Sequence, residues 1–434
     1  MPQINFLGST YSARSNKIDC QRSINYYPEI SQQDSAAVIS LIGTPGLLLF
    51  TLAPMIVRGW HVFNNTLFVV SGDNLYLIDI NGTVSASLGT LSTSTGRVSM
   101  QNNGLASAGV GGNQLIIVDG SGGYIWDVAT STFSNIGTGG GFPTTGASQV
   151  AYIDGYFVII QADTMNVFCS DLYDGTTWNA LATNPVQGAP DNVMGIINHQ
   201  QQLWIIKQYT SEVFYDAGTA TSVGFPFARV PGAVIDYGTV APWAITRASN
   251  TVFFLAMERD NEDGEFIGIV SINGYQTQVV SPAAINYQIS QMTLISDAFS
   301  YSYSDGGHTF IVFTFPTGNK TFVYDTTTQM WHERSTYAGS GFYNINRHIS
   351  DNYIFFNGNH YVSDYSNGNI YQMSSSFFSD NGVPIVSTRV AQHIVEKNTF
   401  DNAFFTRLQL EIEAGTGLGS AVASPNMIPC TFST

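Results

Sequence analysis

The hydrophobic pattern of the chain consists of short apolar runs separated by polar turns, which is typical of β-strands joined by hairpins. Thr321–Arg334 (TFVYDTTTQMWHER) shows the unit most clearly. Phe322–Tyr324 predicts a buried strand, Asp325–Gln329 a polar turn, and Trp331 the anchor of the returning strand. Six other segments have the same order, and their equivalent small polar or acidic positions lie 39 to 55 residues apart. These positions are Asp79, Asp127, Asp171, Asp216, Ser271, Asp325 and Asp364.

A period of this length, made only of strands and turns, predicts the four-stranded blades of a β-propeller. Packing the blades around an axis buries faces that a single sheet would expose. The fold class expected is therefore all-β, with a propeller of six or seven blades. The predicted blade units are Val57–Leu91, Gly96–Ile136, Ala147–Pro185, Val193–Arg229, Val240–Ser281, Phe299–Arg334 and Gly341–Gln372.

Segments at both ends of the chain fall outside the repeat. Residues 1–56 predict an arm that either closes the ring or reaches a neighbour, 57–376 the propeller, and 377–434 a small C-terminal β segment. In the last segment, Ile385–Ile394 and Phe404–Glu413 read as strands. Few residues follow them, so we expect this sheet to be incomplete or to be completed by a partner.

One interruption of the repeat predicts a helix. Ser281 is suited to the N-cap and Pro282 to the first helical position. Ile285, Ile289 and Met292 then lie on one face, which predicts about three turns that pack on the core.

The composition narrows the classes of partner. Charged residues are 11% of the chain, against about 25% in typical domains, and the net charge is −16. The four lysines, Lys17, Lys207, Lys320 and Lys397, are dispersed. Nucleic-acid affinity depends on clustered Lys and Arg, so this chain is not expected to bind DNA tightly. An acidic surface is suited instead to letting DNA pass without adhesion.

Cysteine usage and hydropathy suggest no disulfide framework and no membrane span. Cys20, Cys169 and Cys430 are odd in number and far apart, so free thiols are expected. The most apolar run, Leu41–Val57, is interrupted by Gly and Pro and is shorter than the ~20 residues that a spanning helix needs. No secretory signal is visible at the N-terminus.

A series of motifs in the middle of the chain carries a family resemblance. They are Gly195-Ile196, the strand Leu203–Ile206, Ser211-Glu212 with Phe214-Tyr215, Ala217–Thr221 and Tyr237-Gly238. Shorter matches lie at Gly96–Met100, at Ser281-Pro282 and at Glu411–Ala414 with Thr416-Gly417. In this order they resemble the packaged-DNA stabilisation proteins, also called tail accessory factors or head-to-tail connectors, of short-tailed double-stranded-DNA phages. The sequence departs from that pattern after Gly417.

The resemblance implies a structural protein of the virion, made in the host cytoplasm, and not an enzyme. It implies a homo-hexameric ring below the portal and adaptor proteins. Such a ring continues the channel for double-stranded DNA, retains the packaged genome, and offers surfaces to tail spikes or fibres and to a needle or plug. It implies no cofactor.

The densest acidic run is a candidate channel or interface loop. It contains Glu258, Asp260, Glu262, Asp263 and Glu265, without the register of a calcium loop. A solvated loop tip is the plainer interpretation. The sharper hypothesis is a loop that faces the channel or a neighbouring subunit and repels DNA.

Two other functions are alternatives to that of a phage connector. Tyr303–Phe310 partly resembles the Asp-box turn of sialidases, through Asp305, Gly307, Thr309 and Phe310, so a glycan-binding or glycan-cleaving propeller is one alternative. No pair of carboxylates at a catalytic separation can be identified, and the seven histidines do not fall at metal-ligand spacing. We therefore assign no catalytic and no metal residues. The second alternative is a bacterial surface scaffold.

Overall fold

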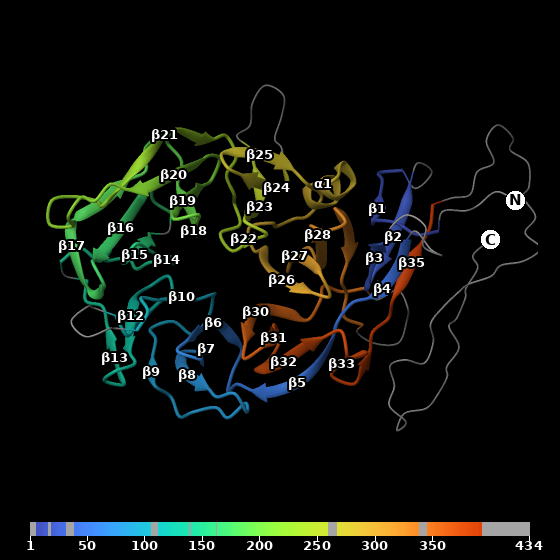
Figure 1. The fold of residues 1–434 in the computed structure, drawn as a ribbon, viewed down its shortest axis with the longest axis horizontal. Coiled ribbons are helices and arrows are strands. Elements are labelled where there is room, and N and C mark those ends of the chain that lie inside the picture. The colour runs from blue at the N-terminus through green and yellow to red at the C-terminus, as the bar shows by residue number, and fades with distance from the viewer. Residues whose placement is uncertain are drawn as a thin grey trace, which may run out of the picture.

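A computed structural model describes residues 6–15, 19–31, 39–105, 112–138, 140–161, 163–258, 267–337 and 345–392. These ranges contain 35 strands and one helix. Most strands lie in sheets that follow one another around a central axis (Figure 1). The prediction of an all-β propeller is therefore confirmed.

Seven sheets of at least four antiparallel strands form the blades among the described residues. The first two are β6 (Val57–Phe63), β7 (Thr66–Ser71), β8 (Asn74–Ile78), β9 (Gly89–Thr90), and β10 (Ser99–Asn102), β11 (Gln114–Val118), β12 (Gly123–Asp127), β13 (Thr132–Asn135). Blades 3 and 4 are β14 (Gln149–Ile153), β15 (Tyr156–Ile160), β16 (Asn166–Asp171), β17 (Asp174–Pro185), and β18 (Val193–His199), β19 (Gln202–Lys207), β20 (Ser211–Asp216), β21 (Phe227–Ile235). Blades 5 and 6 are β22 (Ile245–Ala248), β23 (Thr251–Met257), β24 (Ile267–Asn273), β25 (Gln276–Val279), and β26 (Phe299–Asp305), β27 (His308–Phe315), β28 (Lys320–Asp325), β29 (Met330–Glu333). Blade 7 is β30 (Ser350–Phe356), β31 (Asn359–Asp364), β32 (Asn369–Ser374) and β5 (Gly46–Leu52).

The inner strands close a complete circle, which decides between six and seven blades. Each inner strand contacts the inner strand of the next blade, in the order β6, β10, β14, β18, β22, β26 and β30. The last of these, β30, contacts β6. The propeller thus has seven blades.

The second strand of each blade is apolar on both faces because it is covered by both neighbouring blades. All five residues of β15 are buried, for example. Ile116 and Val118 of blade 2 share a core cluster with Phe157 and Ile159 of blade 3. Burial between blades therefore replaces a single central core.

The repeated aspartate has a local structural task. In the hairpin that follows β28, Asp325 Oδ1 accepts a hydrogen bond of 2.9 Å from the amide of Thr327, and Asp79, Asp127 and Asp216 make the same contact two residues ahead. This Asx turn favours the tight reversal between the third and fourth strands. The repeat is therefore a signal of turns rather than of a binding site.

Two of the seven equivalent points are corrected by the structure. Asp364 also forms an Asx turn, to the amide of Ser366, but it ends β31, the second strand of blade 7. Ser271 lies inside β24, which ends at Asn273. A local turn signal marks a hairpin but does not say which hairpin of the blade it closes.

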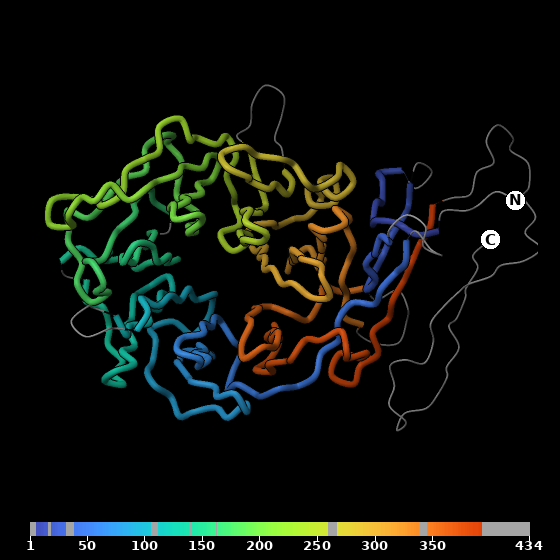
Figure 2. Tube along the Cα trace, in the orientation of Figure 1, coloured from blue at the N-terminus to red at the C-terminus, as the bar shows by residue number. Residues whose placement is uncertain are grey.

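Blade 7 is completed by a strand from the start of the chain. β32 pairs antiparallel with β5, with Met373 opposite Leu47 and Gln372 opposite Leu48. Figure 2 shows this blue segment beside the orange strands of blade 7. The ring is thus closed by hydrogen bonds between two segments from opposite ends of the sequence.

Strands from both termini continue around the outside of blades 6 and 7, and we name them the clasp. They are β1 (Tyr11–Ser12), β2 (Cys20–Ile24), β3 (Tyr26–Ile30), β4 (Ile39–Gly43), β33 (Ser379–Asp380), β34 (Val383–Pro384) and β35 (Thr388–Val390). β2 pairs with β29 at Ile24–Glu333 and with β35, while β33 pairs with β5. Of the predicted C-terminal strands, Phe404–Glu413 lies outside the described residues.

The predicted helix is present but begins later and is shorter. α1 (Ala283–Ser290) has eight residues and its N-cap is Pro282, one residue after the predicted cap. The Ser281 hydroxyl bonds instead with the Asn286 side chain and the backbone of Ile269. Ile285 and Ile289 are buried in a cluster with blades 5 and 6, so core packing is confirmed.

Candidate functional site

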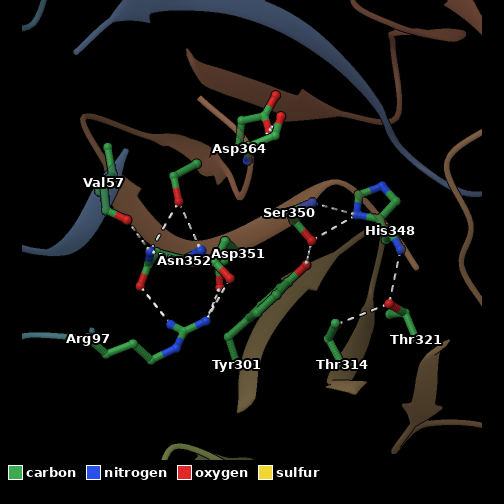
Figure 3. Close-up of polar contacts among 12 residues, drawn as sticks. Val57, Arg97, Tyr301, Thr314, Thr321, His348, Ser350, Asp351, Asn352 and Asp364 are labelled. Carbon is green, nitrogen blue, oxygen red and sulfur yellow. Dashed lines mark hydrogen bonds and ion pairs between the residues drawn. The ribbon is translucent and has the colours of Figure 1, made fainter. Parts of the chain in front are cut away.

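Arg97 links three blades at one end of the propeller axis (Figure 3). It precedes β10 of blade 2, and its guanidinium donates 2.8 Å and 2.9 Å hydrogen bonds to Asp351 Oδ1 and Asn352 Oδ1 of blade 7. The guanidinium also lies 4.0 Å from the ring centroid of Phe299, the first residue of blade 6. Burial lowers the pKa of Arg97, and the adjacent Asp351 opposes this shift. One side chain thus passes inside blade 1 and joins blades 2, 6 and 7.

The same network continues around blades 1, 6 and 7. Asn352 Nδ2 donates to the carbonyl of Val57 in blade 1 at 3.1 Å. Ser350 shares hydrogen bonds of 2.8 Å with Tyr301 of blade 6 and with the ring of His348. Burial lowers the pKa of His348 to about 3, so the ring is neutral at physiological pH.

Gln149 makes the corresponding links on the other side of the axis. Its Nε2 donates to the carbonyl of Pro242, before blade 5, at 2.7 Å, and its Oε1 accepts from the amide of Ile196 in blade 4 at 3.1 Å. Single side chains thus span from blade 2 to blade 7, and from blade 3 to the segment entering blade 5, so the inner faces of non-adjacent blades lie within one side-chain length of each other. A DNA duplex does not fit through the propeller's own centre.

Asn25 is the junction of the clasp. Its Nδ2 donates 2.9 Å hydrogen bonds to the carbonyls of Ser335, after blade 6, and Val386, in the C-terminal segment. Its backbone has a φ of 55°, a left-handed conformation that asparagine tolerates better than most residues. One buried side chain therefore ties both termini to blade 6.

Two arginines hold the clasp strands in place. Arg22 on β2 makes a two-pronged ion pair with Glu333 on β29, with distances of 2.9 Å and 2.6 Å. Arg389 on β35 donates to the carbonyls of Phe6 and Gly8 and to Gln21 Oε1. These contacts attach β2 to blade 6 and attach β35 to the segment that precedes β1.

A buried polar cluster lies beneath the clasp between blades 6 and 7. Arg334 is fully buried, donates to the hydroxyl of Tyr303 and stacks 5.0 Å from its ring centroid. Burial raises the pKa of Asp380 on β33 to about 7, and the positive charge of Arg334 only partly offsets this. His332 is also fully buried, and its ring nitrogens have no hydrogen-bond partner among the described residues. Burial lowers its pKa to about 3, against the opposing field of Asp325.

We expect His332 to make the protein sensitive to acid. The folded state holds the His332 ring neutral, whereas the unfolded chain binds a proton below pH 6.5. The free energy of unfolding is therefore unaffected by this residue above pH 6.5 and falls as the pH is lowered towards 3. At pH 5 the free energy of unfolding is about 2 kcal/mol lower than at neutral pH because of His332. His332→Phe should therefore lose less stability than the unaltered protein between pH 7 and pH 5, as measured by denaturant unfolding at both values. Equal losses would contradict the assignment.

The acidic run is only partly visible in the structure. Glu258 directly follows β23 of blade 5. The pKa of Tyr237 is raised mainly by burial and, to a smaller extent, by the negative charge of Glu258. Asp260, Glu262, Asp263 and Glu265 lie outside the described residues. The candidate channel or interface loop therefore stays a prediction.

Among the described residues, no group of three or more His, Cys, Asp or Glu side chains is placed to hold a metal ion. None of the described helices is long and apolar enough to cross a bilayer. Cys20 and Cys169 are both free thiols, and Cys430 lies outside the described ranges.

The polar contacts across the axis were not predicted from sequence. Arg97 belongs to the Gly96–Met100 motif, but its partners Asp351 and Asn352 are about 250 residues away. Asn25 and Arg334 carry no motif.

Comparison with solved structures returns matches of low sequence identity. The WD40 domain of Pan2 from Neurospora crassa is 8% identical with a TM-score of 0.48, and the match covers 79% of this chain and 98% of that one. The computationally designed protein Ika8 is 11% identical with a TM-score of 0.41, covering 75% and 99%. No curated protein matches in sequence.

A family model matches nearly the whole described propeller. It is the phage-stabilisation family, described as "Bacteriophage P22 Gp10, beta-propeller", and it aligns with residues 8–377. The match runs from the clasp through all seven blades, which agrees with the resemblance noted in the motifs. This chain belongs to the phage-stabilisation family of the P22 Gp10 β-propeller and is a phage structural protein with a role in DNA stabilisation.

Proposed function

We propose that six copies of this chain form a ring in the phage tail, below the portal and adaptor proteins. The ring continues the DNA channel, retains the packaged genome until ejection, and anchors tail spikes or fibres and a needle or plug. The family match over residues 8–377 carries this proposal. The same family match supports a place for this chain in the virion.

The contacts between non-adjacent blades support a channel between copies rather than within one. Arg97 and Gln149 each reach a non-neighbouring blade or its entering segment, so the inside of one propeller is too narrow for a duplex. A conduit wide enough for a duplex must then lie on the common axis of several copies. Ring closure of identical subunits provides such an axis.

The charge of the protein supports passage of DNA without adhesion. With a net charge of −16, a ring of six copies surrounds the DNA with negative potential. Repulsion at the wall lowers the friction of ejection, and retention depends on a plug or a closed state rather than on affinity.

Electron microscopy of the intact particle tests this proposal. We expect six copies of the propeller around the tail axis, with DNA density between them. A phage lacking this chain should package DNA and then lose it, as measured by the DNA content of purified heads, and the plasmid-borne chain should restore retention. DNA density through a propeller centre, or full heads without the chain, would contradict the proposal.

We further propose that the acidic run faces this channel or a neighbouring copy. Replacing Glu258, Asp260, Glu262, Asp263 and Glu265 with their amides should slow genome ejection, because the wall loses part of its repulsion. Ejection is measured by dye release after triggering. A control replaces Glu29 and Asp163, two exposed acids on other parts of the surface, with their amides, which measures the effect of removing acidic charge elsewhere. If the five-site variant ejects DNA and assembles normally, the acidic run is a solvated loop tip and the proposal for this loop is contradicted.

A further inference from the structure

The most apolar run of the chain is largely on the surface. Leu41–Val57 contains no charged residue, and the core uses only part of it, mainly Leu47, Ala53 and Val57. The exposed side chains are Leu48 (50%), Leu49 (45%), Leu52 (62%), Met55 (56%) and Ile56 (43%). Exposed apolar side chains gathered on one short segment favour an interaction site there.

The backbone of this run presents an open sheet edge. On its inner side β5 pairs with β32 along its length. On its outer side β33 pairs with β5 only at Asp380–Leu47, where the amide of Asn381 donates to the carbonyl of Leu47 at 2.7 Å. Beyond Leu47, no strand of the described ranges covers this edge.

The edge carries only part of the usual protection against pairing. Exposed edge strands commonly carry Lys, Pro or a bulge that prevents association. The stretch Leu48–Leu52 contains neither Lys nor Pro, and its one such feature is the irregularity at Phe50, where Leu49 and Thr51 pair with the consecutive residues Tyr371 and Ile370. A turn of blade 1 lies beside this strand, where the Thr51 hydroxyl donates to the carbonyl of Gly82. Ile80 in the same turn is 49% exposed and adds apolar surface.

Charge decides what can cover this edge. Two copies of a chain with a net charge of −16 repel each other, so they associate most favourably through a surface free of charge. No charged residue occurs between Asp34 and Arg58, and Arg58 itself is buried and bonded to loop carbonyls. Polyanions and basic peptides find no complementary charge on this run.

We propose that the outer edge and exposed face of residues 48–56 is a docking surface for a second copy of this chain. The inference rests on the proposed ring and names one of its contact surfaces. Because a ring built from one kind of interface is head-to-tail, the surface met on the next copy is a different one. Added strand hydrogen bonds and burial of leucines stabilise the contact.

The test compares full-length variants by mass photometry and sedimentation velocity. Leu48→Glu with Leu52→Glu places two charges on the exposed edge and should raise the dissociation constant by about 100-fold or more. The control, Gln276→Glu with Gln278→Glu, adds the same charge at exposed positions of β25 in blade 5. We expect the control to associate like the unaltered chain, and the edge variant to be monomeric and to unfold in a single cooperative transition, which shows that it is folded.

The outcomes separate the docking surface from the ring. A hexamer in both the unaltered chain and the edge variant would overturn the docking surface and leave the ring intact. A dimer that the edge variant dissociates would support the surface and overturn the ring. If the control variant dissociates as much as the edge variant, the effect comes from the added overall charge, and the proposed docking surface is contradicted. A monomeric unaltered chain whose edge variant is lost from particles would assign the edge to another virion protein, again overturning a second copy as the occupant.

Discussion

Replacing Leu47 with aspartate is expected to lower the free energy of unfolding by about 4 kcal/mol or more. Leu47 is 1% exposed and lies in a core cluster with Tyr27, Val362 and Met373. The substitution removes most of a buried leucine and places a carboxylate there without a partner. Because β5 closes the ring, the loss should affect the whole propeller rather than one strand.

The adjacent residue provides a matched control. Leu48 is 50% exposed on the same strand, so Leu48→Asp should change the free energy of unfolding by about 0.5 kcal/mol or less. Both substitutions are best compared in a Leu52→Glu background, where association of copies does not contribute to the measured stability. Denaturant unfolding followed by tryptophan fluorescence gives the two values. Similar losses at both positions would mean that β5 is not the closing strand of the core.

Replacing Lys207 with methionine is expected to cost about 3–5 kcal/mol. Lys207 ends β19 in blade 4 and is fully buried, with its Nζ 2.8 Å from Asp191 Oδ1 and 3.2 Å from Glu212 Oε1. Both carboxylates are buried as well. The substitution removes the Lys207 charge from Asp191, and it leaves Glu212 with only the half-exposed Arg229, 3.5 Å away. Burial alone would raise the pKa of Asp191, yet hydrogen bonds from Lys207 and from the amide of Tyr209 keep it below its usual value.

Two further variants show whether the buried charges cause this loss. Adding Glu212→Gln to Lys207→Met should recover part of the stability, because one uncompensated charge is removed. Lys320→Met should cost less than about 1 kcal/mol, because Lys320 is partly exposed and lies 3.7 Å from Glu333, which keeps Arg22 as its partner. Equal losses for Lys207→Met and Lys320→Met in denaturant unfolding would contradict this account.

The blade repeat was readable in the sequence because its causes are local. An aspartate bonds to an amide two residues ahead, and apolar runs of five or six residues fill a strand buried on both sides. The same locality limited the prediction. Asp364 carries the turn signal but closes a different hairpin of its blade, and Ser281 resembles a helix cap although its hydroxyl bonds elsewhere.

The partners of the polar residues were beyond the reach of the sequence. Arg97 meets Asp351, and Asn25 meets Val386, across hundreds of residues. Such pairs depend on how the blades close around the axis, and no local propensity encodes that closure. The use of β5 in blade 7 is of the same kind, because its register with β32 is set by tertiary packing.

The amino-acid sequence by itself determined an acidic all-β chain with a propeller repeat and a phage-family resemblance, because composition, turn chemistry and strand patterning act over a few residues. Only the tertiary structure decided that there are seven blades, that a strand from the start of the chain closes the last blade, and that side chains link non-adjacent blades on the inside of the ring. The reason is that these features come from contacts between segments far apart in the chain, whose free energy exists only once the ring has closed.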